Sequence, residues 1–257
     1  MLEITKLSKH FGGLMAVRDL DISVNRGDIT GLIGPNGAGK TTVFNLITGF
    51  IKPSKGNIVF EKSTITGLSP HIVSKSGIVR TFQDESFLSD LTVMQNIIVA
   101  QYLNPKTGFL EALFNSTGYR RKETYALRRA LEILEFLGLE YFKNELAQNL
   151  PHGYQRLLGI AIALSANPKL LLLDEPLAGM NASEVKQALE LIRKIRASGT
   201  TILIIEHNMT AVMQLCEHIV VLNFGQKIAE GSPEEVSKNS EVIEAYLGVK
   251  KNVAQIK

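Results

Sequence analysis

Hydrophobic and polar positions follow two patterns in the first part of the chain. Leu2–Leu7 and Leu20–Val24 alternate apolar and polar residues, as strands with one buried face do. Ile29–Ile33 is an uninterrupted apolar run, which is typical of a strand buried on both faces. We therefore expect two antiparallel strands, with Phe11 in the connection between them, followed by a central strand.

The same patterns continue through the rest of the chain. Glu123–Leu137 carries apolar residues at helical spacing, namely Leu127, Ala130, Leu131, Leu134 and Leu137, which predicts an amphipathic helix with these residues inward. We expect the section 84–166 around it to be mostly helical. The apolar run Leu170–Leu173, the amphipathic segment Ser183–Ser198 and the apolar run Thr201–Ile205 then predict a strand, a helix and a strand joined by a crossover. The residues expected to face inward on that second helix are Val185, Ala188, Leu189, Ile192 and Ile195.

The C-terminal part predicts a hairpin and a capped helix. Ile219–Leu222 and Lys227–Ala229 are short apolar segments separated by the turn Asn223–Gly225. Ser232 and Glu235 have the spacing of a capping box, with Pro233 between them in the first turn.

The stretch Gly34–Thr42 connects the run Ile29–Ile33 to a predicted helix. It reads Gly-Pro-Asn-Gly-Ala-Gly-Lys-Thr-Thr, which has the spacing and the strand–loop–helix context of a P-loop. Glycines let backbone N–H groups turn toward phosphate oxygens, and the helix N-terminus adds its dipole. The residues assigned to the nucleotide are Gly34, Pro35, Asn36, Gly37, Ala38, Gly39, Lys40, Thr41 and Thr42, with Lys40 on the β- and γ-phosphates and Thr41 also on Mg²⁺.

Two adjacent carboxylates follow the apolar run Leu170–Leu173. Asp174 is suited to hold Mg²⁺ through water, and Glu175 to act as the general base that polarises the attacking water. A general base of this kind contributes roughly 10²- to 10⁴-fold in rate. An apolar run ending in Asp-Glu is by itself an ordinary strand end, and only the P-loop upstream favours the catalytic interpretation.

Gln83 and His207 each follow a predicted strand. Gln83 is placed to sense both Mg²⁺ and the attacking water, and His207 to donate to the γ-phosphate. In isolation, such a glutamine would be a surface residue and such a histidine a structural one. The order of P-loop, Gln83, helical section, carboxylates and His207 favours the functional interpretation.

Composition limits the class of protein. The 257 residues are 45% hydrophobic with a net charge of +3, so we expect a globular protein and no nucleic-acid partner. The single cysteine, Cys216, excludes an internal disulfide, fits a reducing compartment and is expected to be buried and inert. The N-terminus lacks the apolar core of a signal peptide, and the longest apolar region, Leu157–Leu173, is too interrupted to span a membrane.

These motifs together resemble the ATP-binding cassette family over nearly the whole chain. The resemblance implies an α/β fold, in which a P-loop NTPase (RecA-like) core carries an N-terminal antiparallel β subdomain and an inserted α-helical subdomain. Residues 1–83 and 167–230 would form the core, 84–166 the helical subdomain and 231–257 a C-terminal helical tail. The implied motif residues are Gly34–Thr41 (Walker A), Gln83 (Q-loop), Asp174 and Glu175 (Walker B), Ala178–Asn181 (D-loop), His207 (switch histidine) and Phe11 (adenine stacking).

Other segments resemble one branch of the family. Arg80–Gln83, Leu103–Arg121, Ala178–Asn181 and Ile205–Asn208 are similar to the ATPase subunits of branched-chain amino acid importers. Close relatives power urea import or lipopolysaccharide extraction, and Tyr246–Gly248 is similar to import and lipopolysaccharide members alike. Import, export and the transported substrate therefore stay open at this point.

One segment departs from the family pattern. The signature Leu-Ser-Gly-Gly-Gln, which contacts the γ-phosphate of a partner subunit, is replaced by Leu150–Gln155. Pro151 has neither a hydroxyl nor an N–H group, while Gly153 and the helix dipole remain, and Pro151 would also suit a helix's first turn. We expect Gly153 to serve ATP in trans with a weaker clamp. An asymmetric pair with a non-identical second ATPase is therefore favoured over a homodimer.

The resemblance also implies partners and a location. A permease would dock between Gln83 and Gln101, an external substrate-binding protein would act through it, and the chain would lie at the cytoplasmic face of the inner membrane. The apolar residues there are Phe87, Leu88, Leu91, Val93 and Ile97, about half of which we expect in the core. A soluble non-transport cassette would carry two cassettes and charged linkers, and a P-loop kinase would leave Gln83, Asn181 and His207 unexplained.

Overall fold

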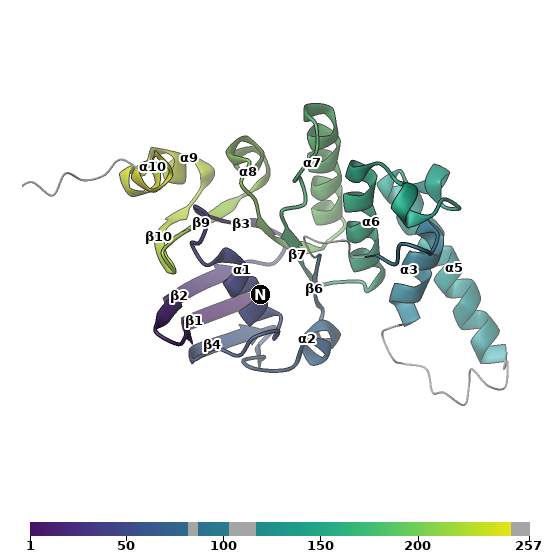
Figure 1. Ribbon diagram of the computed structural model, residues 1–257. Coiled ribbons are helices and arrows are strands. Elements are labelled where there is room, and N and C mark those ends of the chain that lie inside the picture. The colour runs from purple at the N-terminus through teal and green to yellow at the C-terminus, as the bar shows by residue number, and fades with distance from the viewer. Residues whose placement is uncertain (82–86, 103–116, 248–257) are drawn as a thin grey trace, which may run out of the picture. The chain divides into compact units, whose positions relative to one another are not determined.

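The computed structural model describes residues 1–81, 87–102 and 117–247 of the chain (Figure 1). The chain forms two compact units, residues 1–73 with 201–257 and residues 74–200. The first contains the P-loop and the second contains the paired carboxylates.

An antiparallel sheet begins the first unit. Its strands are β1 (Leu2–Phe11), β2 (Leu14–Val24), β4 (Lys55–Phe60) and β5 (Ser63–Thr64), in the order β2-β1-β4-β5. Leu2 pairs with Val24 on one side and with Phe60 on the other, and all three side chains are buried. The predicted antiparallel pair is confirmed, but Phe11 is the last residue of β1 because β1 continues to a tight Gly12–Gly13 turn.

Parallel strands lie behind the P-loop in the same unit. β3 (Ile29–Ile33) pairs in parallel with β8 (Thr201–Ile205) and with β9 (His218–Asn223), and β10 (Gln226–Gly231) adds an antiparallel edge. Every residue of β3 and β8 is buried, as the uninterrupted apolar runs predict. The predicted hairpin of β9 and β10 is confirmed.

The described residues of the first unit also form helices. They are α1 (Lys40–Ile47), α8 (Met209–Leu215), α9 (Pro233–Lys238) and α10 (Ser240–Leu247). The capping box of α9 is present, with the Ser232 side chain accepting from the Glu235 backbone and the Glu235 side chain accepting from the Ser232 backbone.

The second unit combines two parallel strands with helices. After α2 (Pro70–Ser76), β6 (Ile78–Arg80) pairs with β7 (Leu170–Asp174), with Ile78 opposite Leu170. Helices α3 (Val93–Tyr102), α5 (Thr117–Leu137) and α6 (His152–Ser165) pack against one another (Figure 1). Short 3₁₀ turns at Glu140–Phe142 and Ala147–Asn149 precede α6, and α7 (Ala182–Ala197) follows β7.

The predicted buried faces of two helices need correction. On α5, Leu127 and Leu131 are exposed, while the core is formed by Ala126, Ala130, Ile133, Leu134 and Leu137. On α7, Val185 is only half-buried and Leu191 is buried. Helical periodicity predicts an apolar face, but an apolar residue at its margin can lie on either side.

Candidate functional site

Gly34–Thr42 forms a loop between β3 and α1. Gly34, at φ 149°, lies so close to β9 that an added Cβ would be 2.1 Å from the Leu222 carbonyl oxygen. Gly39 precedes α1 at φ 102°, and an added Cβ there would be 2.6 Å from the Ala16 carbonyl oxygen. These positions require glycine, because a side chain would meet backbone atoms in a conformation that L-residues avoid.

The loop encloses the ammonium group of Lys40. The Lys40 ammonium is buried and donates to the carbonyl oxygens of Gly34 at 2.7 Å and Pro35 at 3.0 Å. Asn36, Gly37 and Thr41 lie on the exposed side of the loop, and Thr42 is half-buried. A cationic group inside a glycine loop at a helix N-terminus can bind phosphate, with Lys40 exchanging carbonyl oxygens for phosphate oxygens.

Neighbouring strands hold the loop through backbone bonds. The Gly225 N–H, in the β9–β10 turn, donates to the Ala38 carbonyl at 3.0 Å. The Gly225 carbonyl in turn accepts from the Arg18 N–H of β2 at 2.8 Å. The Gly34–Thr42 loop, which forms the phosphate cradle, is therefore tied by main-chain bonds to the β9–β10 turn and, through that turn, to β2.

The C-terminal helix also reaches the P-loop. The Gly34 backbone N–H donates a hydrogen bond to the Tyr246 hydroxyl on α10, which partly offsets the rise that burial causes in the pKa of Tyr246. Sequence reasoning gave Tyr246 no role at the nucleotide site, because more than 200 residues separate it from Gly34.

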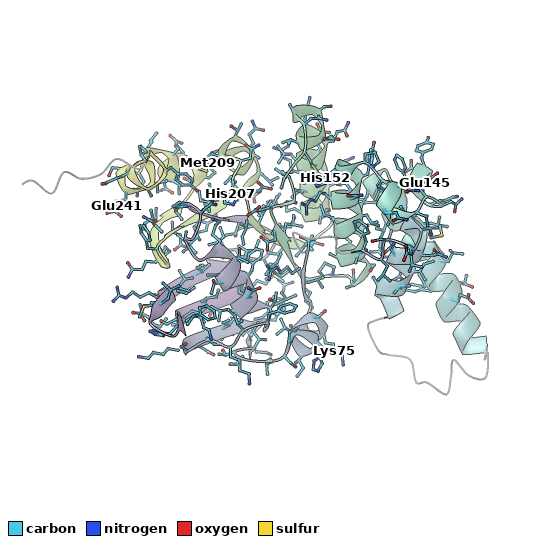
Figure 2. The ribbon with its side chains drawn as sticks, in the orientation of Figure 1. Lys75, Glu145, His152, His207, Met209 and Glu241 are labelled. Carbon is cyan, nitrogen blue, oxygen red and sulfur yellow. The ribbon has the colours of Figure 1, made fainter. Side chains whose placement is uncertain are left out.

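Phe11 and His207 lie in the same unit as the P-loop. The Phe11 ring is 46% exposed, so one face can stack on a base, and the Lys9 ammonium lies 4.9 Å from its centroid. β8 ends at Ile205, and His207 follows one residue later, after Glu206, with its side chain exposed (Figure 2). Its backbone N–H donates to the buried Glu206 carboxylate at 3.1 Å, which fixes the backbone from which the ring projects.

The carboxylate pair lies at the end of β7. Asp174 is the last residue of that strand, and its side chain is completely buried. The Arg80 guanidinium donates to Asp174 Oδ2 at 2.6 Å, and the Arg80 side chain is only 7% exposed. Thr81 completes the contact, since its N–H donates to the Leu172 carbonyl at 2.9 Å and its hydroxyl oxygen accepts from the Asp174 N–H at 3.2 Å.

Glu175 has an unusual backbone conformation. Its φ is 50°, a left-handed value that costs a non-glycine residue about 1 to 2 kcal/mol. The side chain is half-buried at the point where the chain leaves β7 and turns toward α7. Strain of this kind often accompanies a side chain that must point in a defined direction at a functional site.

Arg80 and Thr81 are the site residues that sequence reasoning missed. Both belong to the segment that resembled a transporter branch, but neither was given a role. The available signal was a cationic residue at the end of a short apolar strand, where a buried carboxylate on a neighbouring strand needs a partner. Gln83, assigned to Mg²⁺ and water, lies outside the described residues.

The segment that departs from the signature starts α6. Pro151 occupies the N-cap position and α6 begins at His152, so Pro151 precedes the first turn. Gly153 is buried, and an added Cβ would be 3.0 Å from Glu184 Oε1. Glu184 therefore brings a carboxylate to the first turn of α6, where it interacts favourably with the helix dipole.

The D-loop segment is tied to the start of α7. The Asn181 side chain caps α7, accepting from the N–H groups of Ser183 at 2.9 Å and Glu184 at 3.1 Å. Glu184 Oε2 accepts from the Asn181 N–H at 2.8 Å, which completes a capping box. The His152 ring lies against Gly179, where an added Cβ would be 2.8 Å from the ring. The departing signature and the D-loop are thus in direct contact.

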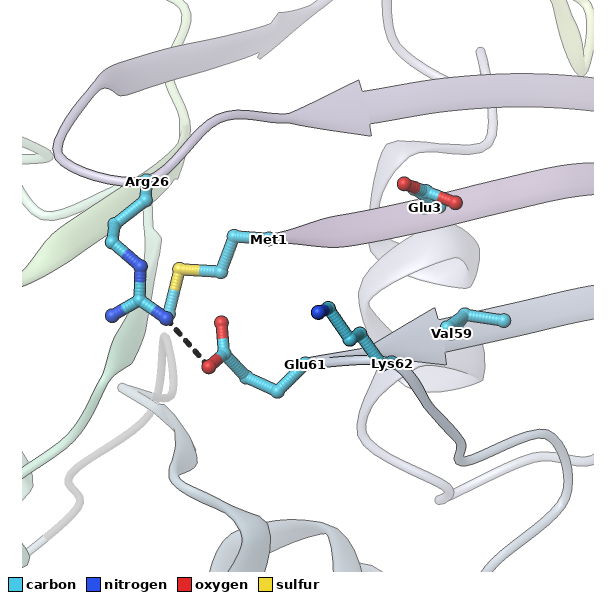
Figure 3. A pocket seen from close by; sticks show the side chains of 6 residues that line it. All are labelled: Met1, Glu3, Arg26, Val59, Glu61 and Lys62. Carbon is cyan, nitrogen blue, oxygen red and sulfur yellow. Dashed lines mark hydrogen bonds and ion pairs between the residues drawn. The ribbon is translucent and has the colours of Figure 1, made fainter.

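A cavity of about 350 Å³ lies elsewhere in the first unit (Figure 3). It contains the ion pair between Arg26 and Glu61, at 2.5 Å. Its lining residues are Met1, Glu3, Arg26, Val59, Glu61 and Lys62. None of them belongs to the P-loop, so this cavity lies apart from the predicted phosphate-binding loop.

Sequence comparisons match the chain to known proteins. A family model described as ABC transporter matches residues 17–178, and one described as branched-chain amino acid ATP-binding cassette transporter matches residues 226–251. The high-affinity branched-chain amino acid transport ATP-binding protein BraF of Pseudomonas aeruginosa is 43% identical, over 96% of this chain and 98% of that protein. LivG of Escherichia coli K12, which has the same description, is also 43% identical with the same coverage.

Solved structures agree with these matches. A nucleotide-free ATP-binding cassette from an ABC transporter superposes with a TM-score of 0.84 and 36% identity, covering 96% of this chain and 98% of that one. The ADP conformation of MJ1267, another ABC transporter cassette, gives a TM-score of 0.84 at 35% identity and the same coverage. The expected P-loop NTPase fold of mixed α/β content is confirmed.

Proposed function

This chain belongs to the ABC transporter family, and on that basis we propose that it is the ATP-hydrolysing subunit of a branched-chain amino acid importer. The observation that carries the proposal is the match to BraF and LivG over nearly the whole length of the chain, together with the C-terminal match at residues 226–251. The P-loop geometry supplies the phosphate site that such a subunit needs.

Nucleotide binding rests on the cradle. Backbone N–H groups from Gly34 to Thr42 surround the phosphates, Lys40 neutralises the β- and γ-phosphates, and Phe11 stacks on adenine. Thr41 and Asp174 offer hydroxyl and carboxylate oxygens, the hard ligands that Mg²⁺ prefers. No cluster of three or more His, Cys, Asp or Glu residues suited to a metal occurs in the described part of the chain. This fits a metal held by few side chains and the substrate phosphates, where it would offset phosphate charge.

Hydrolysis is assigned to Glu175, His207 and Gln83. Glu175 takes a proton from the attacking water, and its strained backbone fixes the direction of the carboxylate. His207 donates to the γ-phosphate from the end of β8. Gln83 is proposed to orient the water and the metal, on the basis of the sequence alone.

We propose that ATP closes two cassettes on each other. Gly153 and the first turn of α6 would contact the nucleotide of the second ATPase, whose own signature serves this P-loop. Because Pro151 removes a hydroxyl and an N–H donor from that turn, we propose a non-identical second subunit. The branched-chain relatives are ATP-binding proteins of transport systems, which supports a permease partner.

The permease contact is proposed for the segment before and within α3. Leu88 is exposed there, whereas Val93 and Ile97 are buried. Asn96 shapes the segment, since its side chain accepts from the Leu88 N–H at 2.7 Å and donates to the Leu88 carbonyl at 3.0 Å.

No helix of the described residues combines the length and apolar character needed to cross a membrane. We propose that the chain sits peripherally at the inner face, and that a substrate-binding protein acts indirectly through the permease.

Uptake measurements test the transport assignment. Cells that lack this chain should lose uptake of labelled leucine, isoleucine and valine, and the wild-type chain should restore it. Normal amino acid uptake combined with lost urea uptake or defective lipopolysaccharide export would contradict the proposal.

A Glu175→Gln variant tests the ATPase mechanism. It should bind ATP normally and hydrolyse it roughly 10²- to 10⁴-fold more slowly, because the amide cannot take a proton from water. Glu190→Gln, an exposed carboxylate on α7, is the matched control and should hydrolyse at the wild-type rate. Normal turnover in Glu175→Gln would overturn the assignment of the base.

A further inference from the structure

The ion pair between Arg80 and Asp174 places a permanent cation on the carboxylate that is proposed to hold Mg²⁺. The two groups are 2.6 Å apart and almost fully buried. A buried carboxylate is costly without a compensating charge, and a guanidinium supplies both the charge and hydrogen bonds of fixed direction. Arg80 therefore does for Asp174 what a bound metal would otherwise do.

The surrounding contacts hold this pair in place. Arg80 ends β6 and Asp174 ends β7, and Arg80 lies opposite Leu172 in the parallel register. The next residue, Thr81, bonds to both Leu172 and Asp174 through its backbone and side chain. The two strand ends are thus fixed together, and the guanidinium cannot leave the carboxylate by separation of the strands without breaking these bonds.

We propose that Arg80 is a positioning residue that competes with Mg²⁺ for Asp174. Arg80 compensates the charge of the Asp174 carboxylate before the metal–nucleotide complex arrives. The metal must then share the carboxylate with Arg80 or displace Arg80 from it. Two cations on one carboxylate repel each other strongly in a buried site. Arg80 therefore lowers the affinity for the metal and restricts metal binding to the state in which nucleotide phosphates add further negative charge. This inference rests on the proposed function.

Two roles of Arg80, competing with the metal and only orienting Asp174, predict opposite changes in metal affinity when the Arg80 charge is removed. If Arg80 only orients Asp174, its removal weakens metal binding. If Arg80 competes, the neutral variant Arg80→Gln binds the metal more tightly, by about tenfold, which corresponds to roughly 1.4 kcal/mol. The sign of the change separates the two roles.

The probe is Mn²⁺, measured by electron paramagnetic resonance in the presence of saturating ADP. Arg80→Gln should show about tenfold tighter Mn²⁺ binding than the wild type, by the same conversion. The matched control is Arg26→Gln, which breaks the Arg26–Glu61 ion pair remote in sequence from the carboxylates, and it should match the wild type. Unchanged or weaker Mn²⁺ binding in folded Arg80→Gln protein would overturn the inference.

A second measurement uses the unaltered protein, because Arg80→Gln leaves a buried carboxylate without its cation and can unfold. In a sample labelled with ¹⁵N-arginine, the buried Arg80 side-chain signal should shift when Mg²⁺ and ADP are added together. It should stay unchanged when ADP is added with a chelator. An Arg80 signal that ignores Mg²⁺ would overturn the inference regardless of how the variant folds.

Different results would overturn the proposed function and the role of Arg80. A wild-type protein that binds no Mn²⁺ with ADP would overturn the proposed function and this inference together. Wild-type binding with no gain in Arg80→Gln and no Arg80 signal change would overturn the inference alone.

Discussion

Two regions of the molecule are held by different kinds of contact. One is the phosphate cradle, Gly34–Thr42, and the other is the carboxylate edge, where Asp174 at the end of β7 meets Arg80 and Thr81. In the cradle, main-chain groups make the bonds, such as the Gly225 N–H to the Ala38 carbonyl, and Gly34 adopts a conformation open only to glycine. At the carboxylate edge, side chains make them, above all Arg80 to Asp174 and the Thr81 hydroxyl to the Asp174 backbone.

This difference explains which site is visible in a sequence. A main-chain cradle needs glycines at fixed offsets, so its geometry can be predicted from nine consecutive residues. The carboxylate edge depends on which strands pair, and Arg80 and Asp174 are 94 residues apart in the chain. Local patterns give no direct information about such a pair.

The largest expected effect comes from breaking the cradle at Gly34. In Gly34→Ala the new methyl group would be 2.1 Å from the Leu222 carbonyl oxygen, so the loop must move. We expect ATP binding to weaken at least about 100-fold, or roughly 2.7 kcal/mol, as measured with a fluorescent nucleotide.

Gly37→Ala is the matched control for that change. Gly37 also has a positive φ, 79°, but an added Cβ there meets nothing within 4 Å. In Gly37→Ala the only expected penalty is the conformational strain of alanine at a positive φ, about 1 to 2 kcal/mol. If both variants bind ATP equally well, the close approach to β9 does not shape the cradle.

A smaller effect is expected at the carboxylate edge in Thr81→Val. The change keeps the side-chain volume but removes the oxygen that accepts from the Asp174 N–H at 3.2 Å. We expect a loss of about 1 to 2 kcal/mol in the free energy of unfolding, measured with denaturant, together with an altered Mg²⁺ dependence of hydrolysis.

Thr201→Val supplies the comparison in the first unit. Thr201 is also buried, and its hydroxyl oxygen accepts from the Gly27 N–H at 2.9 Å in a partly buried hydrogen bond. It should cost a similar free energy of unfolding and leave the Mg²⁺ dependence unchanged. A shift in Mg²⁺ dependence in Thr201→Val would mean that the effect of Thr81 is not local to the carboxylates.

Sequence reasoning succeeded where neighbouring residues determine the structure. The capping box of Ser232 and Glu235, the β9–β10 hairpin and the buried strand β3 all follow from short patterns, and all are present. The direct contact of Glu184 with the start of α6 and the reach of Tyr246 to Gly34 depend on tertiary packing. The inward face of α5 was wrong at Leu127 for the same reason, because burial is decided by the helices that pack against it. The roles of Gln83 and Gly153 stay predictions.

The smallest expected effect concerns the apolar support behind the cradle. Cys216 packs on β3, where a Cβ added to Gly31 would be 3.0 Å from its sulfur. Burial, with smaller contributions from Glu217 and Glu206, raises the pKa of Cys216 from 9.0 to about 12. The folded state therefore holds the thiol proton more tightly than the unfolded state. The stabilisation is complete below pH 9 and is lost as the pH rises toward 12.

We expect the wild type to lose about 1 kcal/mol more of its unfolding free energy between pH 8 and pH 10 than Cys216→Ala does. The comparison removes the contributions of lysines and tyrosines, which titrate in both proteins. Native Cys216 should also resist alkylation at pH 8 and react readily in denaturant, because the thiolate is the nucleophile. Rapid alkylation of the native protein would show that the back of the cradle is open to solvent. The cradle would then depend on its main-chain bonds alone, without an apolar layer of side chains behind it.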